Sequence, residues 1–266
     1  MMKKTRLFPK IAAMMIVAIM VCVMVASAYQ GYASTLYGND HNYYAYGTYY
    51  VDSATRVRAG TWVRTTDYAT VPARTIGCQA TLVYVNTREV FYSTAQVMNP
   101  DADYFYSIIT PSRPASQTAC SVGWASVEGS PYIRLSPCYE GDNYSRSGNV
   151  ESQLTALAEK TLTADNAYPV NAAGETYGSI LLADMVGENP DLISAVNQDN
   201  VSGYIRLEDI TEPCQSSARS VDQSMDLYDA DGNVIGTFEC GEAEVLAIDA
   251  PDFETAQAKA NEILCQ

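Results

Sequence analysis

The chain has one histidine, His41, and no Gly-x-Ser-x-Gly sequence. A Ser-His-Asp or Cys-His hydrolase needs an imidazole beside its nucleophile to accept a proton, and many Ser hydrolases carry that glycine-flanked serine. His41 lies in a tyrosine-rich stretch outside the segments that predict a core, so we interpret it as an exposed loop residue. These absences argue against a histidine-dependent hydrolase, and the sequence offers no candidate catalytic residue.

Cysteine spacing suited to zinc is also absent, because no C-x-x-C pair occurs. The segment from Asp229 to Asn233 is similar to a calcium loop, but an EF-hand needs glycine at its sixth position and glutamate at its twelfth. Here Gly232 is fourth and Cys240 is twelfth. We therefore predict a hairpin turn, with a weak surface calcium site as the alternative, and we expect no metal site and no cofactor.

Positive charge is scarce, since 16 basic residues face 31 acidic ones and the net charge is −15. The imbalance lies mainly in residues 150–266, which hold 22 of the acidic residues and four basic ones: Lys160, Arg206, Arg219 and Lys259. Such a surface repels nucleic acids and anionic membranes. We expect no nucleic-acid partner and no membrane insertion of the mature chain, and we interpret the charge mainly as a source of solubility.

The first 28 residues have the composition of a secretory signal peptide. A basic stretch precedes an apolar run from residue 11 to residue 25, and Ala26-Ser-Ala28 follows as a cleavage site. The apolar run is shorter than the roughly 20 residues of a membrane-spanning helix. We predict cleavage after Ala28 and a secreted, extracellular product, either released or associated with the cell envelope. Retention of the segment as an anchor is the alternative.

Cleavage would remove Cys22 and leave six cysteines, an even number that predicts disulfides in an exported protein. Six cysteines allow 15 pairings, and sequence alone does not choose among them. Among these pairings we favour Cys78 with Cys120 across a sandwich core, Cys214 with Cys240 beside a hairpin, and Cys138 with Cys265 between the two halves of the chain.

The pattern of residues 51–140 predicts an antiparallel β-sandwich-like domain. Apolar and polar residues alternate along short segments at 54–64, 76–84, 89–97, 104–109 and 119–126. The preceding residues, 29–50, hold eight tyrosines among small and polar residues, and we predict a flexible segment there, whose last part could pair as an edge strand. The sequence therefore begins its mature part with a soft tyrosine-rich stretch followed by strands.

Glycine, asparagine and serine at residues 141–149 predict a linker to an acidic α+β domain at 150–266. From Val150 to Leu162 apolar residues recur at helical spacing, which predicts a helix. Pro190 and Asp191 suit the first turn of a second, short helix at 190–196. Further expected elements are a strand at 203–207, a hairpin of 225–228 with 234–239, and a helix at 253–264. The whole chain is thus predicted to be β-rich and α+β.

Four segments carry a resemblance to known proteins. They are Tyr168-Pro-Val-Asn-Ala-Ala-Gly-Glu-Thr-Tyr-Gly-Ser179, Pro190-Asp-Leu-Ile193, Gly203-Tyr-Ile-Arg206 and Leu227-Tyr-Asp-Ala-Asp-Gly232. With them, residues 165–240 resemble a module of uncharacterised exported proteins of Gram-positive bacteria. The resemblance implies an extracellular bacterial protein and assigns no catalytic residue.

The outer side of the strand at 54–64 supplies the candidate ligand-binding residues. Val57, Ala59, Thr61 and Val63 alternate with a basic, aromatic set: Arg56, Arg58, Trp62 and Arg64. Guanidinium groups offer forked hydrogen-bond donors and an indole offers a stacking surface, so this face could hold an anionic or sugar ligand. The alternatives are an ordinary solvent-exposed sheet face and docking against the acidic half of the chain.

These features favour a secreted, non-catalytic binding protein or cell-envelope-associated protein. Its expected partner is a cell-wall glycan or another extracellular protein. The first alternative is a carbohydrate-active hydrolase that uses paired carboxylates of the acidic half. The second is a structural or accessory secreted protein without a ligand.

Overall fold

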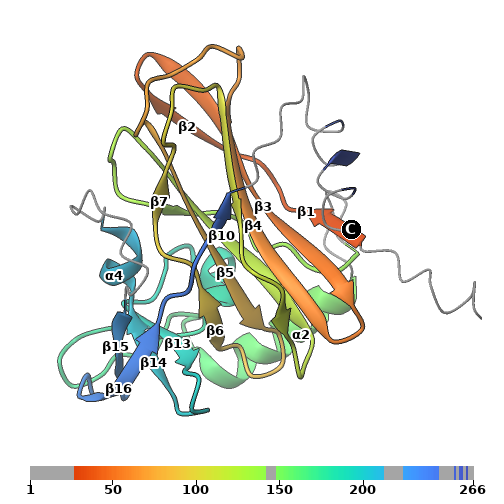
Figure 1. Cartoon of the computed structure of the whole chain (residues 1–266). Helices are drawn as coiled ribbons and strands as arrows, with labels where there is room; N and C mark the ends of the chain where they lie inside the picture. Colours follow the sequence, from red (N-terminus) through yellow and green to blue (C-terminus); the bar gives the residue numbers. More distant parts are fainter. Residues whose placement is uncertain are drawn as a thin grey trace, which may run out of the picture.

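The computed structural model describes residues 27–141, 148–212 and 224–245, together with residues 255, 258, 259 and 262. Two β-sheets pack face to face, and short helices cover the far side of the second sheet (Figure 1). The β-rich, α+β fold class predicted from the sequence is therefore confirmed. Among the described residues, no helix is long and apolar enough to cross a membrane.

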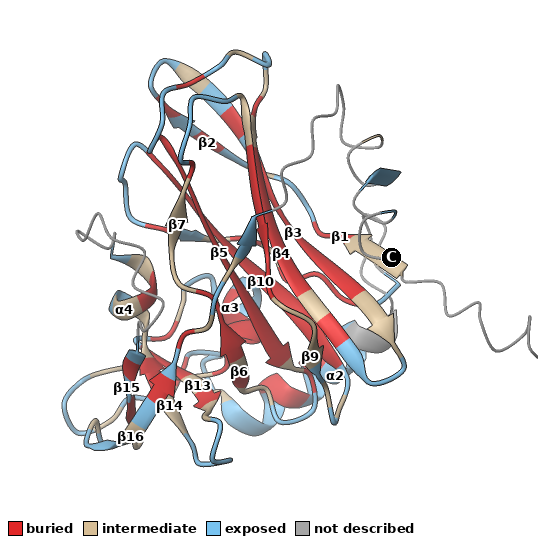
Figure 2. Ribbon diagram, in the orientation of Figure 1, coloured by how far each residue is buried: buried red, intermediate tan, exposed pale blue. Residues whose placement is uncertain are grey.

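The first sheet is antiparallel, in the strand order β1-β3-β4-β8-β17. Its strands are β1 (Ser27–Gln30), β3 (His41–Ser53), β4 (Arg56–Thr65), β8 (Phe105–Ile109) and β17 (Glu244–Val245), with β2 (Ser34–Gly38) beside β3 and β9 (Arg113–Pro114) beside β4. The predicted alternation along β4 is confirmed, because Val57, Ala59 and Val63 belong to the core between the sheets. Figure 2 shows that β3 and β4 are buried along most of their length.

Residues 29–50, predicted as a flexible segment with a strand in its last part, form strands from their start: β1, β2 and most of β3. Tyr43 and Tyr49 point into the core between the sheets and are 0% and 2% exposed. Large rings at alternate positions bury much apolar area, which offsets the weak strand preference of the surrounding small residues. The predicted cleavage point after Ala28 lies within β1, and residues 1–26 lie outside the described residues, so the signal peptide stays a prediction.

The second sheet is mixed, in the order β11-β10-β5-β6-β13-β14-β15-β16. Its strands are β5 (Ile76–Tyr84), β6 (Val90–Ser93), β10 (Ala119–Val127), β11 (Ile133–Arg134), β13 (Leu192–Val196), β14 (Ser202–Arg206), β15 (Ser224–Tyr228) and β16 (Val234–Glu239), with β7 (Val97–Met98) beside β5 and β12 (Tyr177–Gly178) beside β13. β13 runs parallel to β6 with Ala195 opposite Val90. Strands from both sides of the predicted linker thus share one sheet. Residues 142–147 of that linker lie outside the described residues. The predicted domain boundaries therefore stay a prediction.

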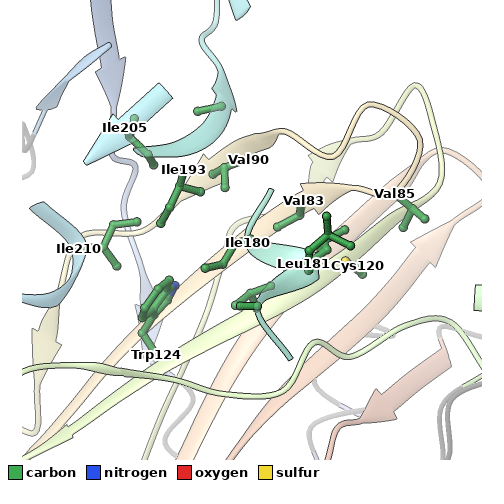
Figure 3. Close-up of a cluster of buried hydrophobic side chains, with 14 of the residues drawn as sticks. Val83, Val85, Val90, Cys120, Trp124, Ile180, Leu181, Ile193, Ile205 and Ile210 are labelled. Atoms are coloured by element: carbon green, nitrogen blue, oxygen red, sulfur yellow. The ribbon is translucent and has the colours of Figure 1, made fainter. Parts of the chain in front are cut away.

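A second core lies between the mixed sheet and the helices, which are α2 (Gly148–Thr161), η1 (Ile180–Leu182), α3 (Ala183–Val186) and α4 (Leu207–Thr211). The predicted helix after the linker is confirmed as α2, whose Leu154 and Leu157 are 3% and 1% exposed. Trp124 of β10 packs in the same cluster as Ile180 and Ile210 (Figure 3). This helix-covered core therefore joins residues from positions 83 to 240.

The short helix predicted at residues 190–196 is wrong, since residues 192–196 form β13. Leu192, Ile193 and Ala195 are fully buried, and β13 is paired along its length with β14. Asp191 caps no helix; its Oδ2 accepts hydrogen bonds from the backbone N and the Oγ1 of Thr176, both at 2.8 Å. Tertiary pairing outweighs the local helix-start signal here.

The structure also corrects one disulfide. In the β5–β10 register Cys78 lies opposite Ala125, whereas Cys120 lies opposite Val83. The two cysteines are five positions apart along the strand pair and belong to different cores, beyond the Cα separation of about 4.4–6.8 Å that a disulfide requires. The described part of the chain holds no disulfide. Cys214 and Cys265 lie outside the described residues, so the pairings of Cys214 with Cys240 and of Cys138 with Cys265 stay predictions.

Buried phenols and thiols make alkaline stability testable. Burial raises the pKa values of Tyr50 and Cys240 to about 12, and it raises those of Tyr49 and Tyr168 further. Unfolded thiols and phenols titrate near about 8.5 and 10, so the folded state retains protons that the unfolded state has lost. Stability is therefore fully present below about pH 8.5 and falls progressively up to about pH 12.

Urea unfolding followed by circular dichroism checks this expectation. The midpoint at about pH 11 should lie well below that at about pH 8, in buffers of equal ionic strength. Replacing Tyr50 with phenylalanine should flatten part of the decline above about pH 10, because it removes one phenol with a raised pKa. Equal midpoints at the two pH values would contradict the expectation.

Candidate ligand-binding surface

All four predicted binding residues lie on β4, on the side of the first sheet that faces away from the second sheet. Trp62 is not available to a ligand, since it is 1% exposed. Its indole lies between the rings of Tyr46 and Phe105, with centroid separations of 6.2 and 5.1 Å. The stacking platform expected from the sequence is thus part of a packed layer.

Arg58 is engaged within the chain. Its Nε lies 2.9 Å from Asp52 Oδ2 and its Nη1 lies 3.0 Å from Glu244 Oε2. Glu244 belongs to the acidic half of the chain, so at this point the basic face meets that half, as the docking alternative expects. Arg56 is exposed at the start of β4, where its Nε donates a 3.0 Å hydrogen bond to Ser112 Oγ.

Arg64 lies between two tyrosine rings. Its guanidinium carbon is 5.2 Å from the centroid of Tyr44 and 4.9 Å from that of Tyr68, and these tyrosines are 40% and 45% exposed. Its Nη1 donates a 3.2 Å hydrogen bond to the carbonyl of Thr65. Within the described ranges, no carboxylate lies within ion-pair distance of this guanidinium. Arg64 therefore retains a positive charge between aromatic faces.

Tyr68 has a left-handed backbone conformation, with φ of +58°. A tyrosine there is strained, and such strain persists only where the surroundings fix it. The turn is fixed by a hydrogen bond from Thr65 Oγ1 to the carbonyl of Ala69 at 3.0 Å and by one from the Ala69 amide to Asp67 Oδ1 at 3.2 Å. Its ring also contacts that of Tyr104, at 5.7 Å.

We name Tyr44, Arg64, Tyr68 and Tyr104 the arginine–tyrosine cluster. The sequence singled out Arg64 but missed its three tyrosines. Tyr44 lies opposite Arg64 in the β3–β4 register. Predicting this pair from the sequence would require knowing where the hairpin between the two strands turns. Tyr68 comes from a loop, where no periodic pattern assigns a face, and Tyr104, predicted as the first residue of a strand, lies just before β8.

Next to the cluster, His41 is the first residue of β3 and half-buried, which corrects the expectation of an exposed loop residue. Its Nδ1 lies 3.1 Å from Asp67 Oδ2. The pKa of Asp67 is lowered, first by the hydrogen bond from the Ala69 amide and also by His41. This pair supports the turn that carries Tyr68.

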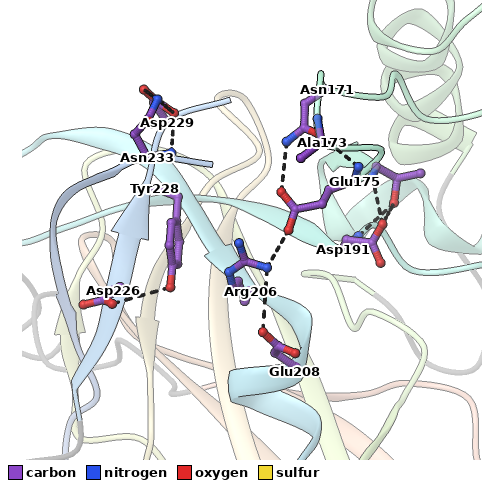
Figure 4. A network of polar contacts seen from close by, with 11 residues as sticks. Asn171, Ala173, Glu175, Asp191, Arg206, Glu208, Asp226, Tyr228, Asp229 and Asn233 are labelled. Carbon is purple, nitrogen blue, oxygen red and sulfur yellow. Dashed lines mark hydrogen bonds and ion pairs between the residues drawn. The ribbon is translucent and has the colours of Figure 1, made fainter. Parts of the chain in front are cut away.

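The segments that resemble exported proteins meet in a separate network (Figure 4). Glu175 Oε2 accepts a 3.0 Å hydrogen bond from Asn171 Nδ2, and its Oε1 forms an ion pair with Arg206. The Arg206 guanidinium lies 4.7 Å from the centroid of Tyr228. Because each charged group is paired inside the chain, these residues hold β14, β15 and the loop before β12 together rather than presenting a site.

The predicted hairpin at 225–239 is confirmed, with β15 and β16 antiparallel. Asp229 Oδ1 accepts hydrogen bonds from the backbone N of Asp231 at 3.0 Å and of Asn233 at 2.8 Å. Hydrogen bonding by the Asn233 side chain is the main cause that lowers the pKa of Asp229. The aspartate therefore organises the turn.

No known protein family, curated protein or solved structure matches this chain. The function must be inferred from the chemistry of the surface itself.

Proposed function

We propose that the protein is a secreted, non-catalytic binding protein that holds an anionic cell-envelope saccharide at the arginine–tyrosine cluster. The observation that supports this proposal most directly is the Arg64 guanidinium, which has no carboxylate partner among the described residues and lies between two half-exposed tyrosine rings. The chain has a net charge of −15, so a cation without a carboxylate beside it differs from the mainly acidic composition. It gives an anion a specific point of attachment.

The side chains of the cluster suit a sugar that carries a carboxylate or phosphate. The guanidinium offers forked donors to the anionic group, and each exposed tyrosine offers a ring face and a hydroxyl to the saccharide. The strain at Tyr68 supports a role in binding, because a glycine would satisfy the same turn without strain. We therefore infer that tyrosine occupies this strained position because its ring and hydroxyl contact the ligand.

Binding to purified Gram-positive cell walls tests the proposal, before and after extraction of their phosphate-bearing polymers. We expect retention on intact walls and little retention on extracted ones. Replacing Arg64 with glutamine should weaken binding about tenfold, which corresponds to about 1.4 kcal/mol, as for a lost hydrogen bond to a charged group. Arg74→Gln is the matched control, since Arg74 carries the same charge on the surface but contacts no ring among the described residues.

Tyr68→Gly separates binding from stability. It should leave the free energy of unfolding unchanged or raise it by up to about 1 kcal/mol through relief of the left-handed strain, while wall binding falls. Unchanged wall binding in both the Arg64 and the Tyr68 variants would reject this site. Turnover of wall glycan by the intact protein would instead favour the hydrolase alternative.

A further inference from the structure

A layer of buried side chains covers the outer face of the first sheet, the side directed away from the second sheet. Tyr46, Tyr50, Trp62 and Ile109 are 3%, 2%, 1% and 1% exposed. They belong to neither of the two hydrophobic cores. In the strand register Tyr46 lies opposite Trp62, which lies opposite Ser107, so this outer aromatic layer is continuous across β3, β4 and β8.

Such burial requires a covering element. Rings on the open face of a sheet shield the residues beneath them, but their own outer surfaces stay accessible to solvent. Here the large rings themselves are almost inaccessible, although Tyr44 and Arg64 on the same face remain partly exposed. The cover therefore lies over the middle of the face and stops short of the arginine–tyrosine cluster.

We propose that the C-terminal segment of the same chain, residues 246–266, packs on the outer aromatic layer. The last described strand, β17, pairs with β8 at the edge of this sheet, so the chain enters the segment beside the layer. The Glu244–Arg58 ion pair fixes that entry, because Arg58 lies on the same face as Trp62. The segment that follows Val245 has 21 residues.

The sequence of the segment fits the layer. Thr255, Ala258, Lys259 and Glu262 are helical, and the last three are exposed. At 3.6 residues per turn these four share one side of a helix. The opposite side carries the apolar residues Phe253, Ala256, Ala260, Ile263 and Leu264. The helix predicted from the sequence at 253–264 lies mostly outside the described residues. Twelve helical residues span about 18 Å and four strands span about 14 Å, so such a helix is long enough to cross the layer.

Tryptophan fluorescence in the full chain tests this docking. The chain has two tryptophans, and Trp124 lies in the helix-covered core. Ile263→Asp should place a carboxylate against the outer aromatic layer, detach the segment and increase acrylamide quenching several-fold. Ala258→Asp adds the same charge on the exposed side of the helix and should leave quenching unchanged. The same pair of variants in a Trp62→Phe chain should show no difference, which assigns the signal to Trp62.

Equal quenching in the Ile263→Asp and Ala258→Asp variants would overturn the proposal, as would free quenching of Trp62 in the intact protein. Light scattering decides between one chain and two: the proposal expects a monomer, and a dimer that Ile263→Asp dissociates would assign the cover to a second copy. If Ile263→Asp unfolds the chain, Ile263→Ser in the full chain replaces it. Quenching in this variant should exceed that in Ala258→Ser, and equal quenching in the two would overturn the proposal.

Discussion

Replacing Gly241 with alanine is expected to lower the free energy of unfolding by about 3 kcal/mol, the upper part of the range for overpacking a core. A Cβ at this position would lie 1.8 Å from Tyr92 Oη and 2.3 Å from its Cζ. The ring cannot move away freely, because Oη donates a 3.0 Å hydrogen bond to the carbonyl of Glu242 and the Arg113 guanidinium lies 3.9 Å from the ring centroid. Urea unfolding measures the loss.

Gly236→Ala is the matched control for this effect. Gly236 lies in β16, and the nearest atom to its added Cβ would be Asn197 Nδ2 at 3.6 Å, an ordinary contact. The free energy of unfolding of the Gly236→Ala variant should change by less than about 1 kcal/mol. In a double-mutant cycle, Tyr92→Ala should reduce the cost of Gly241→Ala, because it removes the atoms that clash. Equal losses for both glycine variants would show that the close contact does not determine stability.

The second large effect is expected for Trp124→Ala, which should cost about 3 to 5 kcal/mol. Trp124 is 1% exposed and belongs to the core shared by β10, the helices and β13–β16. Because that core joins residues from both sides of the predicted linker, the loss should appear as one cooperative transition at a lower temperature. Calorimetry and near-ultraviolet circular dichroism measure it.

Tyr37→Ala provides the comparison, since Tyr37 is 67% exposed and its removal should change stability by less than about 0.5 kcal/mol. Two separate calorimetric transitions in the intact protein, with only the second shifted by Trp124→Ala, would contradict the shared core. That result would instead support two independently folding domains with the boundaries predicted from the sequence.

The strands of the first half were predictable because alternation reports which residues share a face. The segments predicted at 76–84, 104–109 and 119–126 correspond to β5, β8 and β10 within one residue at each end. Alternation does not report what covers a face, however. The sequence assigns Trp62 correctly to the side opposite Val63, but it does not predict the packing of its indole between Tyr46 of β3 and Phe105 of β8.

The errors have a common physical origin in long-range pairing. Pro190 and Asp191 are local helix-start signals, but β14 pairs with residues 192–196 along their length and makes them a strand. The sequence favours a disulfide between Cys78 and Cys120 across a core, but the strand register places these residues on opposite faces of the β5–β10 pair. The candidate site was only partly predictable for the same reason, since Tyr68 reaches Arg64 from a loop and Tyr104, just before β8, contacts Tyr68.

The position of β17 has a consequence for the order of folding. β17 is the last strand in sequence, yet it pairs with β8 of the first sheet, while β16 just before it belongs to the second. When the chain is synthesised from its N-terminus, the edge of β8 has no β17 to pair with until residue 245 has been made. Until then Arg58 also lacks its ion-pair partner Glu244. Closure of the first sheet thus joins segments more than 130 residues apart and makes completion of the fold a late, slow event. If the chain is exported, as we propose, it would complete this sheet only after nearly all of it had crossed the membrane.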